Sequence, residues 1–496
     1  MKTKNILMSG LLASAMFMSC TQLESEMYDT INPGIFPKNQ ADAEALVTAA
    51  AYSPFKSNWY SGLFTVASGG VQIMGDMVTD VAYCQWNDPC WPDMLNVNFT
   101  VASPNISGPY GYMRDISKMT LTVDRIKDVP MPDDVKERLI GEIHCGKGWL
   151  GYLLYDWFGP IQIASLEQLN NPLVDEILPR LSKEDMVKFI ETELLEAIKV
   201  LPKNYPASDP NYGRFTAGLA YTVLMKLYMH EGDWVKAEQC AREIMKSDYG
   251  YALVPEYADI FTLENERNSE IIFACQSDRS AGSMALWQAH VLPSVYPTNN
   301  PNIQKWSGYR VPWSFYKTFE KEDKRLEVLV GEFTGTDGVI YNEENPGSVL
   351  WGGALPIKYG EDPEATGEAS SVDWIVYRYA DVLTSLAEII VRKDNAVSQE
   401  ALSLLNTIRE RAGIKPYGMG DINGVQDFLD KVLLNRGQEF WFEGLRRTDL
   451  IRHGKFVEFA KKYKGSVAAD KHMELMPLPQ SVIDQGKGQV IQNPGY

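Results

Sequence analysis

Most residue patterns that mark catalytic and metal-binding sites are missing from this 496-residue sequence. It has five histidines, no two of them spaced to share a metal ion on a helix, and no C-x-x-C. Without a G-x-S-x-G motif, a nucleophile-elbow hydrolase has no support. Gly141–Gly148 is one residue from a phosphate-binding loop, but Gly148 stands where that loop needs Ser or Thr, and the segment has a helical period. We therefore expect no catalytic residues, no zinc site and no phosphate site.

Positively charged residues are outnumbered by negatively charged ones. Asp and Glu total 65 against 47 Lys and Arg, so the formal net charge is −18. A chain this acidic has no general electrostatic attraction for nucleic acid, which we do not expect as a partner. After residue 20, no apolar run reaches the roughly eighteen residues that a membrane-spanning helix needs.

The first 19 residues have the composition of an export signal. Lys2 and Lys4 supply positive charge, and residues 6–18 form an apolar stretch too short to span a bilayer. Cys20 follows directly, and it has three interpretations: a disulfide partner, a buried thiol, or a chemical anchor. We expect cleavage before Cys20 and lipid attachment to its sulfur. A plain secretory signal cut nearby is the alternative.

Residues 20–38 are polar and contain two prolines, so we expect a lipid-anchored tether with little regular structure. Five cysteines follow the tether, and their odd number argues against a complete disulfide framework. Cys84 and Cys90 are close enough in sequence to pair across a short loop. Cys145, Cys240 and Cys275 lie in apolar patterns and are expected to be buried thiols.

Helical patterns dominate from Gln40 onward. Residues 216–249 form two amphipathic helices around a turn, with the 34-residue length of a tetratricopeptide repeat. A second helix pair of this kind runs over residues 377–413. Further helices are expected over 112–126, 133–158 and 183–200.

Two segments, 71–99 and 290–313, are rich in Pro, Asn, Gly and aromatic residues, and we predict that they are non-helical loops. They hold too many large aromatic rings for disorder. Residues 287–316 contain seven aromatic residues, where the 11% of the whole chain predicts about three. Either the rings pack the loops onto the rest of the protein, or they bind a ligand.

Flat rings on loops suit carbohydrate, because sugars stack their C–H faces on aromatic rings while their hydroxyls bond to Asp, Asn and Arg. The alternative is that these rings pack the loops onto the helices. The candidate ligand-binding residues are Trp86, Asp88, Trp91, Trp287, Tyr296, Trp306 and Tyr309.

Paired carboxylates are the feature that a glycosidase would need, about 5–9.5 Å apart across a cleft. Asp76 with Asp80, and Asp88 with Asp93, are pairs of this kind in the sequence. Solvated surface acids are the more common case, so we expect no hydrolase activity.

Near the C-terminus, residues 435–456 place four arginines among acidic residues. We predict a helix whose apolar side holds Phe440, Trp441 and Leu445. Glu439 and Glu443 lie near arginines at helical spacing, which favours ion pairs and a structural role in packing the last elements.

This segment resembles the signature of the SusD/RagB family of Bacteroidetes outer-membrane lipoproteins, roughly E-R-x-x-E-[LF]-x-F-E-G-x-R-W-x-D-L-x-R. Asn435 replaces the usual Glu, and Arg447 the usual Trp. The matching residues are Arg436, Glu439, Phe442, Glu443, Gly444, Arg446, Asp449, Leu450 and Arg452. Further stretches resemble family motifs in the right order, at residues 152–163, 377–392, 404–414 and 476–496.

The resemblance implies a mostly α fold of the SusD type, in which tetratricopeptide-like helix pairs support long irregular loops. Residues 39–260 would be its N-terminal helical repeat region and 261–496 its C-terminal region. Such proteins are anchored through lipid, here on Cys20, at the surface of the outer membrane.

The resemblance also implies that the protein binds oligosaccharide or polysaccharide without cleaving it and delivers it to a SusC-like TonB-dependent transporter. Some relatives take peptides or sialic acid instead, and a tetratricopeptide-type scaffold for protein partners without a sugar ligand is a further alternative. No cofactor is implied. Some relatives hold calcium, but no local pattern places a calcium ion here.

Overall fold

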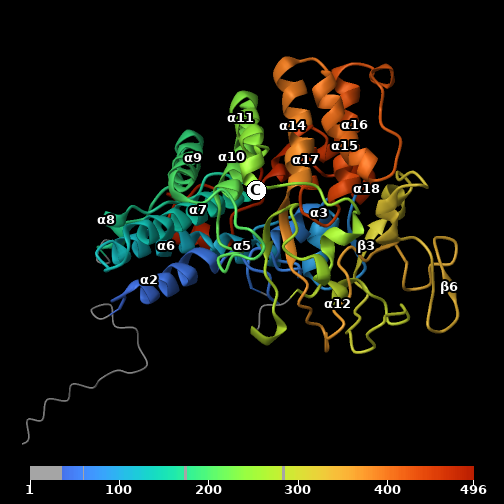
Figure 1. Cartoon of the computed structure of the whole chain (residues 1–496), viewed down its shortest axis with the longest axis horizontal. Coiled ribbons are helices and arrows are strands. Elements are labelled where there is room, and N and C mark those ends of the chain that lie inside the picture. Colours follow the sequence, from blue (N-terminus) through green and yellow to red (C-terminus); the bar gives the residue numbers. More distant parts are fainter. Residues whose placement is uncertain (1–35, 60, 172–175, 282–284) are drawn as a thin grey trace, which may run out of the picture.

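The computed structural model of the chain describes residues 36–59, 61–171, 176–281 and 285–496 (Figure 1). The signal peptide 1–19, Cys20 and most of the tether 20–38 lie outside the described residues and stay predictions. The fold is mostly α, as predicted, with short strands, all but one of which lie between Ile271 and Arg378. Among the helices of the described part, none is both long and apolar enough to cross a membrane.

The helices of the first half stack around α7. The predicted helices over 112–126, 133–158 and 183–200 are confirmed to within a residue. A Cβ on Gly148 of α7 would lie 2.6 Å from Leu194 of α9, so the glycine allows close helix packing where the sequence is similar to a phosphate loop. These helices are α2 (Gln40–Val47) with a π-helical turn (Thr48–Tyr52), α5 (Pro104–Gly111), α6 (Met113–Ile126), α7 (Asp133–Phe158), α8 (Leu166–Leu169) and α9 (Lys183–Val200).

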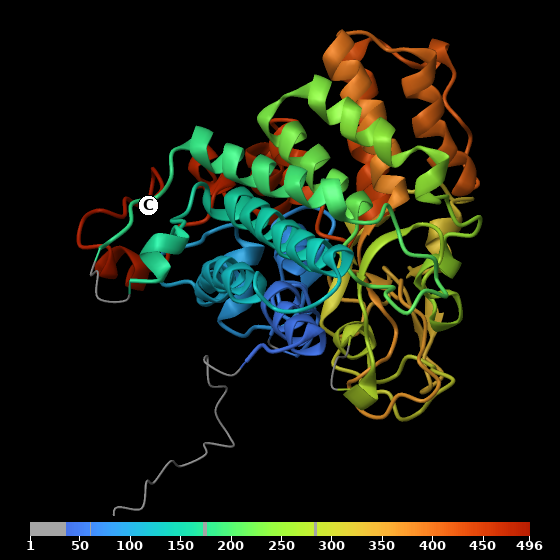
Figure 2. The ribbon, with the colours of Figure 1, turned by 60° about the vertical axis from the view of Figure 1, so that its left-hand side comes forward.

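Both predicted helix pairs are present, and they stand side by side on one side of the molecule (Figures 1 and 2). The side chain of Thr216 caps the first pair by accepting from the Leu219 N–H at 3.1 Å. Gly232 makes the turn between its two helices at φ +74°. The pairs are α10 (Ala217–Glu231) with α11 (Trp234–Ile244), and α14 (Tyr379–Asp394) with α15 (Gln399–Arg411).

The other helices are mostly short. Two of them, α3 and α4, lie within residues 71–99, so the prediction of a non-helical loop is wrong there. Every residue of α3 is buried, which removes the amphipathic period that would reveal it. These helices are α3 (Val71–Met77), α4 (Cys90–Leu95), α12 (Trp287–Val291), α13 (Trp313–Tyr316), α16 (Val425–Phe440), α17 (Arg446–Arg452), α18 (Phe456–Lys464) and α19 (Gln480–Gln485). Short 3-10 helices lie at Ser247–Tyr249, Ala258–Phe261, Leu263–Asn265, Arg279–Ala281, Lys324–Glu327, Met419–Asp421 and Lys471–Glu474.

A small antiparallel sheet joins the two predicted loop segments. Its strands run in the order β1-β3-β7-β4, and Tyr83 of β1 pairs with Arg310 of β3. Two further strand pairs, β2 with β8 and β5 with β6, form separate two-stranded sheets. The strands are β1 (Tyr83–Cys84), β2 (Ile271–Cys275), β3 (Tyr309–Pro312), β4 (Leu329–Val330), β5 (Phe333–Thr334), β6 (Ile340–Tyr341), β7 (Gly353–Pro356) and β8 (Trp374–Arg378).

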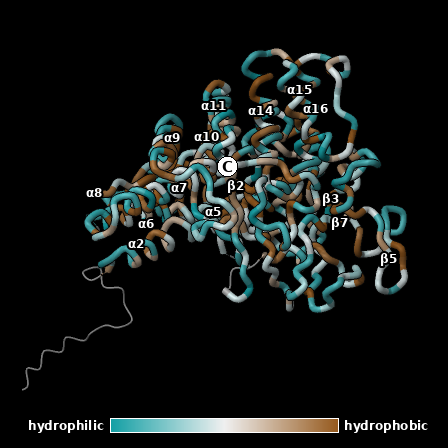
Figure 3. Tube along the Cα trace, viewed as in Figure 1, coloured by the Kyte–Doolittle hydropathy of each residue, from teal (hydrophilic) through white to brown (hydrophobic). Residues whose placement is uncertain are grey.

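One large hydrophobic core runs through both halves of the sequence. At its centre the ring of Trp149 on α7 stacks on Phe55, with centroids 4.2 Å apart, and meets Phe273 of β2 edge-on at 4.9 Å. Figure 3 shows the helices alternating between hydrophobic and hydrophilic residues, as one-sided burial requires. A division of the chain after residue 260 stays a prediction.

The predicted helix over 435–456 is broken. Helix α16 ends at Phe440, and residues 441–445 form a turn in which Phe442 has φ +59° and Gly444 has φ +78°. The break has a packing cause: the backbone of Gly444 lies against Gly75 of α3, where a Cβ would be 2.7 Å from the Gly444 oxygen. Helix α17 then begins at Arg446.

Because of this break, Glu439 and Glu443 find partners on other elements. Glu439 pairs with Arg378 at 2.6 Å and also with Arg325 and Arg411. Glu443 pairs with Arg378 at 2.7 Å and with Lys358. Ion pairing is confirmed, but the expectation that it follows helical spacing is wrong for both acids. The network is buried and fixes the last elements to the core.

Candidate functional site

Two aromatic residues predicted from separate loops meet at the edge of the small sheet. Trp86 follows β1 and Trp306 precedes β3, so the pairing of these strands brings them together. The Gln85 N–H donates to the Gly308 carbonyl at 2.9 Å, and the indole Nε1 of Trp86 donates to the Trp306 carbonyl at 3.1 Å. Sheet register therefore fixes both rings relative to one another.

Trp59 joins these two residues, and we call Trp59, Trp86 and Trp306 the ring platform. Ring centroids are 6.4 Å apart between Trp86 and Trp306, and 5.5 Å apart between Trp59 and Trp306. All three side chains are partly exposed. Large, rigid and partly exposed rings at one place are the arrangement on which a flat, weakly polar ligand stacks.

A buried layer supports the ring platform from beneath. The ring of Trp86 lies 5.8 Å from Trp91, 5.3 Å from His290 and 5.6 Å from Tyr309, and all three of these residues are buried. Burial lowers the pKa of His290 to about 4, and its Nδ1–H donates to the Leu286 carbonyl at 2.8 Å. The layer under Trp86 is thus uncharged near neutral pH.

Three of the predicted ligand residues lie in the core. Trp287 and Tyr309 have no exposed surface, and Trp91 is 3% exposed. The indole of Trp287 donates to the Pro356 carbonyl at 3.2 Å, and the Tyr309 hydroxyl donates to the Val66 carbonyl at 2.5 Å. For these three the structure favours the alternative interpretation, in which the rings pack the loops onto the core.

The other four predicted residues reach the surface. Trp86, Trp306 and Tyr296 are partly exposed, and Asp88 is exposed. Tyr296 packs on Phe333 of β5 with ring centroids 5.0 Å apart. Their roles in ligand binding stay predictions.

Sequence reasoning missed Trp59 and His290. Trp59 lies outside the two aromatic loops, in the Asn- and Gly-containing stretch 57–62, and its carbonyl accepts from the Thr65 hydroxyl at 2.6 Å. An aromatic residue within such a turn-forming stretch is the signal that would have found it. No sequence pattern indicated His290, because its ring neighbours Trp86, Trp306 and Tyr309 are distant from it in sequence.

Three of the four carboxylates in the predicted pairs are bonded within the protein, and the fourth, Asp88, is exposed. Asp76 accepts the backbone N–H groups of Gly444 and Arg446 at 2.9 and 3.2 Å, and Asp80 pairs with the Arg446 guanidinium at 2.8 Å. Asp93 accepts from the Ser103 hydroxyl at 2.5 Å. Over the described residues, no group of three or more His, Cys, Asp and Glu side chains is arranged to hold a metal ion.

Five cysteines are free thiols in the described part of the chain. Cys84 is buried and Cys90 is half-buried, and they do not form a disulfide. Cys145, Cys240 and Cys275 are buried, as predicted. Burial raises the pKa of Cys84, Cys145 and Cys275, which makes them unreactive.

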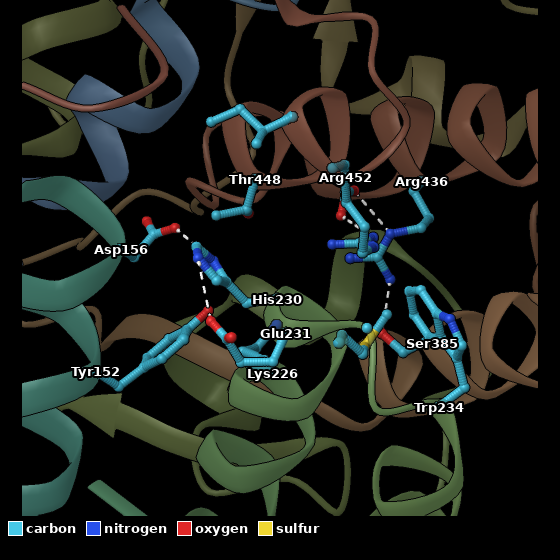
Figure 4. Close-up of a pocket in the computed structure, with 14 residues that line it drawn as sticks. Tyr152, Asp156, Lys226, His230, Glu231, Trp234, Ser385, Arg436, Thr448 and Arg452 are labelled. Carbon is cyan, nitrogen blue, oxygen red and sulfur yellow. Dashed lines mark hydrogen bonds and ion pairs between the residues drawn. The ribbon is translucent and has the colours of Figure 1, made fainter. Parts of the chain in front are cut away.

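A hollow of about 310 Å³ lies between helices α7, α10, α14, α16 and α17 (Figure 4). Its cations already have partners in this chain: Arg436 pairs with Asp449 at 2.7 Å, and Arg452 with Asp449 at 2.7 Å. His230 faces Asp156 at 3.5 Å. With its charges used internally, this hollow offers a ligand less than the ring platform does.

Comparison with known proteins finds SusD-like relatives by sequence and a shared fold by structure. Residues 269–496 match the sequence model of the SusD family. A SusD-like protein of Bacteroides ovatus is 23% identical over 76% of this chain and 70% of its own length. The starch-binding protein SusD of Bacteroides thetaiotaomicron is 22% identical over 85% of this chain and 84% of its own length.

A solved structure shares the fold. Surface glycan-binding protein A from Bacteroides thetaiotaomicron, in complex with laminarihexaose, superposes with a TM-score of 0.73. The match covers 92% of this chain and 100% of the other, at 19% sequence identity. At that identity the likeness establishes the fold.

Proposed function

We propose that this chain, a member of the SusD family whose sequence model matches residues 269–496, binds an oligosaccharide or polysaccharide at the cell surface and delivers it to a SusC-like TonB-dependent transporter. Two kinds of relative support a glycan as the ligand. One is named a starch-binding protein, and one was solved with laminarihexaose. Delivery to the transporter rests on the family resemblance.

The ring platform is the observation that carries the proposal. Trp59, Trp86 and Trp306 come from three segments and meet at the surface, where their faces offer apolar area at low entropy cost. The uncharged layer beneath keeps the rings in place without attracting ions. Asn87 and Asp88 are exposed beside Trp86 and would bond to sugar hydroxyls.

The protein binds its ligand without cleaving it. Of the carboxylate pairs in the sequence, Asp76 and Asp80 are buried and already bonded to Arg446 and its neighbours. A buried, ion-paired carboxylate cannot protonate a glycosidic oxygen or activate water. The relatives are named for binding and not for catalysis.

Lipid attachment at Cys20 would hold the protein to the outer membrane, with residues 20–38 as the tether. A calcium ion, which some family members hold, has no site assigned in this proposal. Peptide or sialic acid is the alternative ligand class within the same family.

Native gel electrophoresis in gels that contain soluble starch, laminarin or xylan tests the proposal, with the chain beginning at Thr21. We expect at least one polysaccharide to retard the protein. Trp306→Ala should lose most of that retardation, because it removes the central ring of the platform, whereas Tyr463→Ala, a half-exposed ring on α18, should behave as wild type.

Retardation that survives Trp306→Ala would contradict the assignment of the site. No retardation by any of the polysaccharides, with binding to a peptide mixture instead, would favour the alternative ligand class.

A further inference from the structure

We propose that Trp351 and Tyr83 form a second contact site for the same glycan, so that the surface takes an extended chain of several sugar units. This inference rests on the proposed function and deepens it. Tyr83 lies in β1 and Trp351 is two residues before β7, so the second site lies on the same four-stranded sheet that brings Trp86 and Trp306 together.

Trp351 is the most exposed tryptophan of the chain. It is 57% exposed, while the other tryptophans are half-buried or buried. Its ring meets the ring of Tyr83 at a centroid distance of 5.8 Å and an angle of 64°. A large ring exposed to water and held by an edge contact to a second ring offers a face on which a sugar can stack.

The chain is shaped to bring these two rings together. Gly352, directly after Trp351, has φ +91°, and a Cβ there would lie 2.9 Å from the Tyr83 ring. A side chain at position 352 would therefore push Tyr83 away and strain the backbone. From Gly353 the chain enters β7, which pairs with β3.

Arg310 ties the second site to the ring platform. Its side chain has no exposed surface, and its guanidinium donates to the Val349 carbonyl at 2.8 Å, the Val291 carbonyl at 3.0 Å and the Ser307 hydroxyl at 2.7 Å. Val349 is two residues from Trp351, and Ser307 follows Trp306. One buried side chain thus holds both aromatic segments in a fixed relation.

The cost of this arrangement indicates its importance. Burial lowers the pKa of Arg310 to about 9, and its hydrogen-bond partners are carbonyl and hydroxyl oxygens. Burying a guanidinium costs free energy, which hydrogen bonds to neutral oxygens offset only in part. Tyr83 and Trp86 are three residues apart in sequence, so their Cα atoms are at most about 10 Å apart, a distance that a chain of several sugar units can bridge.

Two linked contacts predict a dependence on ligand length. A sugar that reaches only the ring platform is indifferent to Trp351, whereas a longer one gains from both contacts because the second binding step is intramolecular. The matched ligands are maltotriose with maltohexaose, and laminaritriose with laminarihexaose, chosen after the polysaccharide that retards the protein.

Calorimetric titration of wild type, Trp351→Ala, Trp351→Phe and Trp306→Ala tests this. We expect Trp351→Ala to weaken hexasaccharide binding about tenfold and to leave trisaccharide binding unchanged. Trp351→Phe keeps a flat ring and should recover most of the loss. Tyr463→Ala, which removes a half-exposed ring on α18, is the control.

If Trp351→Ala binds the hexasaccharide as wild type does while Trp306→Ala fails to bind, the second site is wrong and the proposed function stands. If equal losses occur for trisaccharide and hexasaccharide, Trp351 belongs to the ring platform and the length argument fails. If wild type binds none of the polysaccharides, the proposed function fails together with this inference.

Discussion

The position of Trp86 depends on the side chain that Gly308 lacks. A Cβ on Gly308 would lie 2.5 Å from the indole ring of Trp86, closer than any real contact. The hydrogen bond from the Trp86 indole to Trp306 and the pairing of Gln85 with Gly308 depend on this close approach. A single methyl group at this position would therefore displace the Trp86 ring of the ring platform while leaving all three of its tryptophans in the sequence.

We expect Gly308→Ala to weaken glycan binding about tenfold and to change the tryptophan fluorescence, because the Trp86 ring must move. The far-ultraviolet circular dichroism should stay as in wild type. Titration with the hexasaccharide measures the affinity. Gly420→Ala is the control, since a Cβ on the exposed Gly420 meets no atom within 4 Å. Unchanged affinity in Gly308→Ala would mean that the Trp86 ring does not contact the ligand.

Among the structural elements, the turn at 441–445 decides how the C-terminal helices sit. Gly444 has φ +78°, and a Cβ on it would lie 2.4 Å from the backbone of Gln72 in α3. Gln72 in turn bridges this turn to β8, donating to the Glu443 and Ile375 carbonyls at 3.2 and 3.0 Å. The turn thus joins three elements that are distant in sequence.

Gly444→Ala should lower the free energy of unfolding by about 3 kcal/mol, since it adds a steric clash to a strained φ. Gly454→Ala should cost only about 1 kcal/mol, because Gly454 has φ +66° but a Cβ there meets nothing within 4 Å. Denaturation with guanidinium chloride measures both. Equal losses in the two variants would show that φ strain, and not packing against α3, sets the cost.

The elements that sequence predicted well are the long amphipathic helices. Helices α7, α9, α10 and α11 show their period in the residues themselves, and each also has a local cap or turn residue. Helix α3 and the break after Phe440 were not predictable in this way. Their causes are contacts with segments about 370 positions away, which no local pattern records.

The candidate site was predictable only in part, because local composition locates aromatic residues but contacts between distant segments decide which of them are exposed. Aromatic density located Trp86 and Trp306, but density does not distinguish an exposed ring from a buried one such as Trp287. Exposure is decided by the sheet that joins the two segments, and strands of two to four residues leave little trace in sequence. The ion pairs of Glu439 were expected, but with the wrong partners.

At the scale of the whole molecule, buried ion pairs make the free energy of unfolding depend on pH. Burial alone would raise the pKa of Glu439, but the guanidinium groups of Arg411, Arg378 and Arg325 lower it to about 2. The pKa values of Asp381, Glu388 and Asp449 are lowered by arginines or Lys226 in the same way, against the effect of burial. A carboxylate with a lower pKa in the folded state stabilises it above the unfolded pKa and loses that effect as pH falls.

We expect the free-energy difference between wild type and Glu439→Gln to be largest above pH 5 and to shrink by about 3 kcal/mol as pH falls toward 2. Urea denaturation at a series of pH values measures it. Burial raises the pKa of Asp76 to about 7, so the contribution of Asp76 to stability changes with pH in the opposite direction. Because wild type and variant both contain Asp76, this contribution cancels in the difference between them. Glu458→Gln, at an exposed acid, should show no such change, and a pH-independent difference for Glu439→Gln would contradict the argument.

The ion pair between Asp80 and Arg446 joins residues that are 366 positions apart. At a synthesis rate of about 5–20 residues per second, the ribosome adds Arg446 on the order of 20–70 s after Asp80. During that interval Asp80 lacks its Arg446 partner and α3 lacks its contacts with the turn at 441–445. These native contacts between the two ends of the sequence can therefore form only after nearly the whole chain has been made.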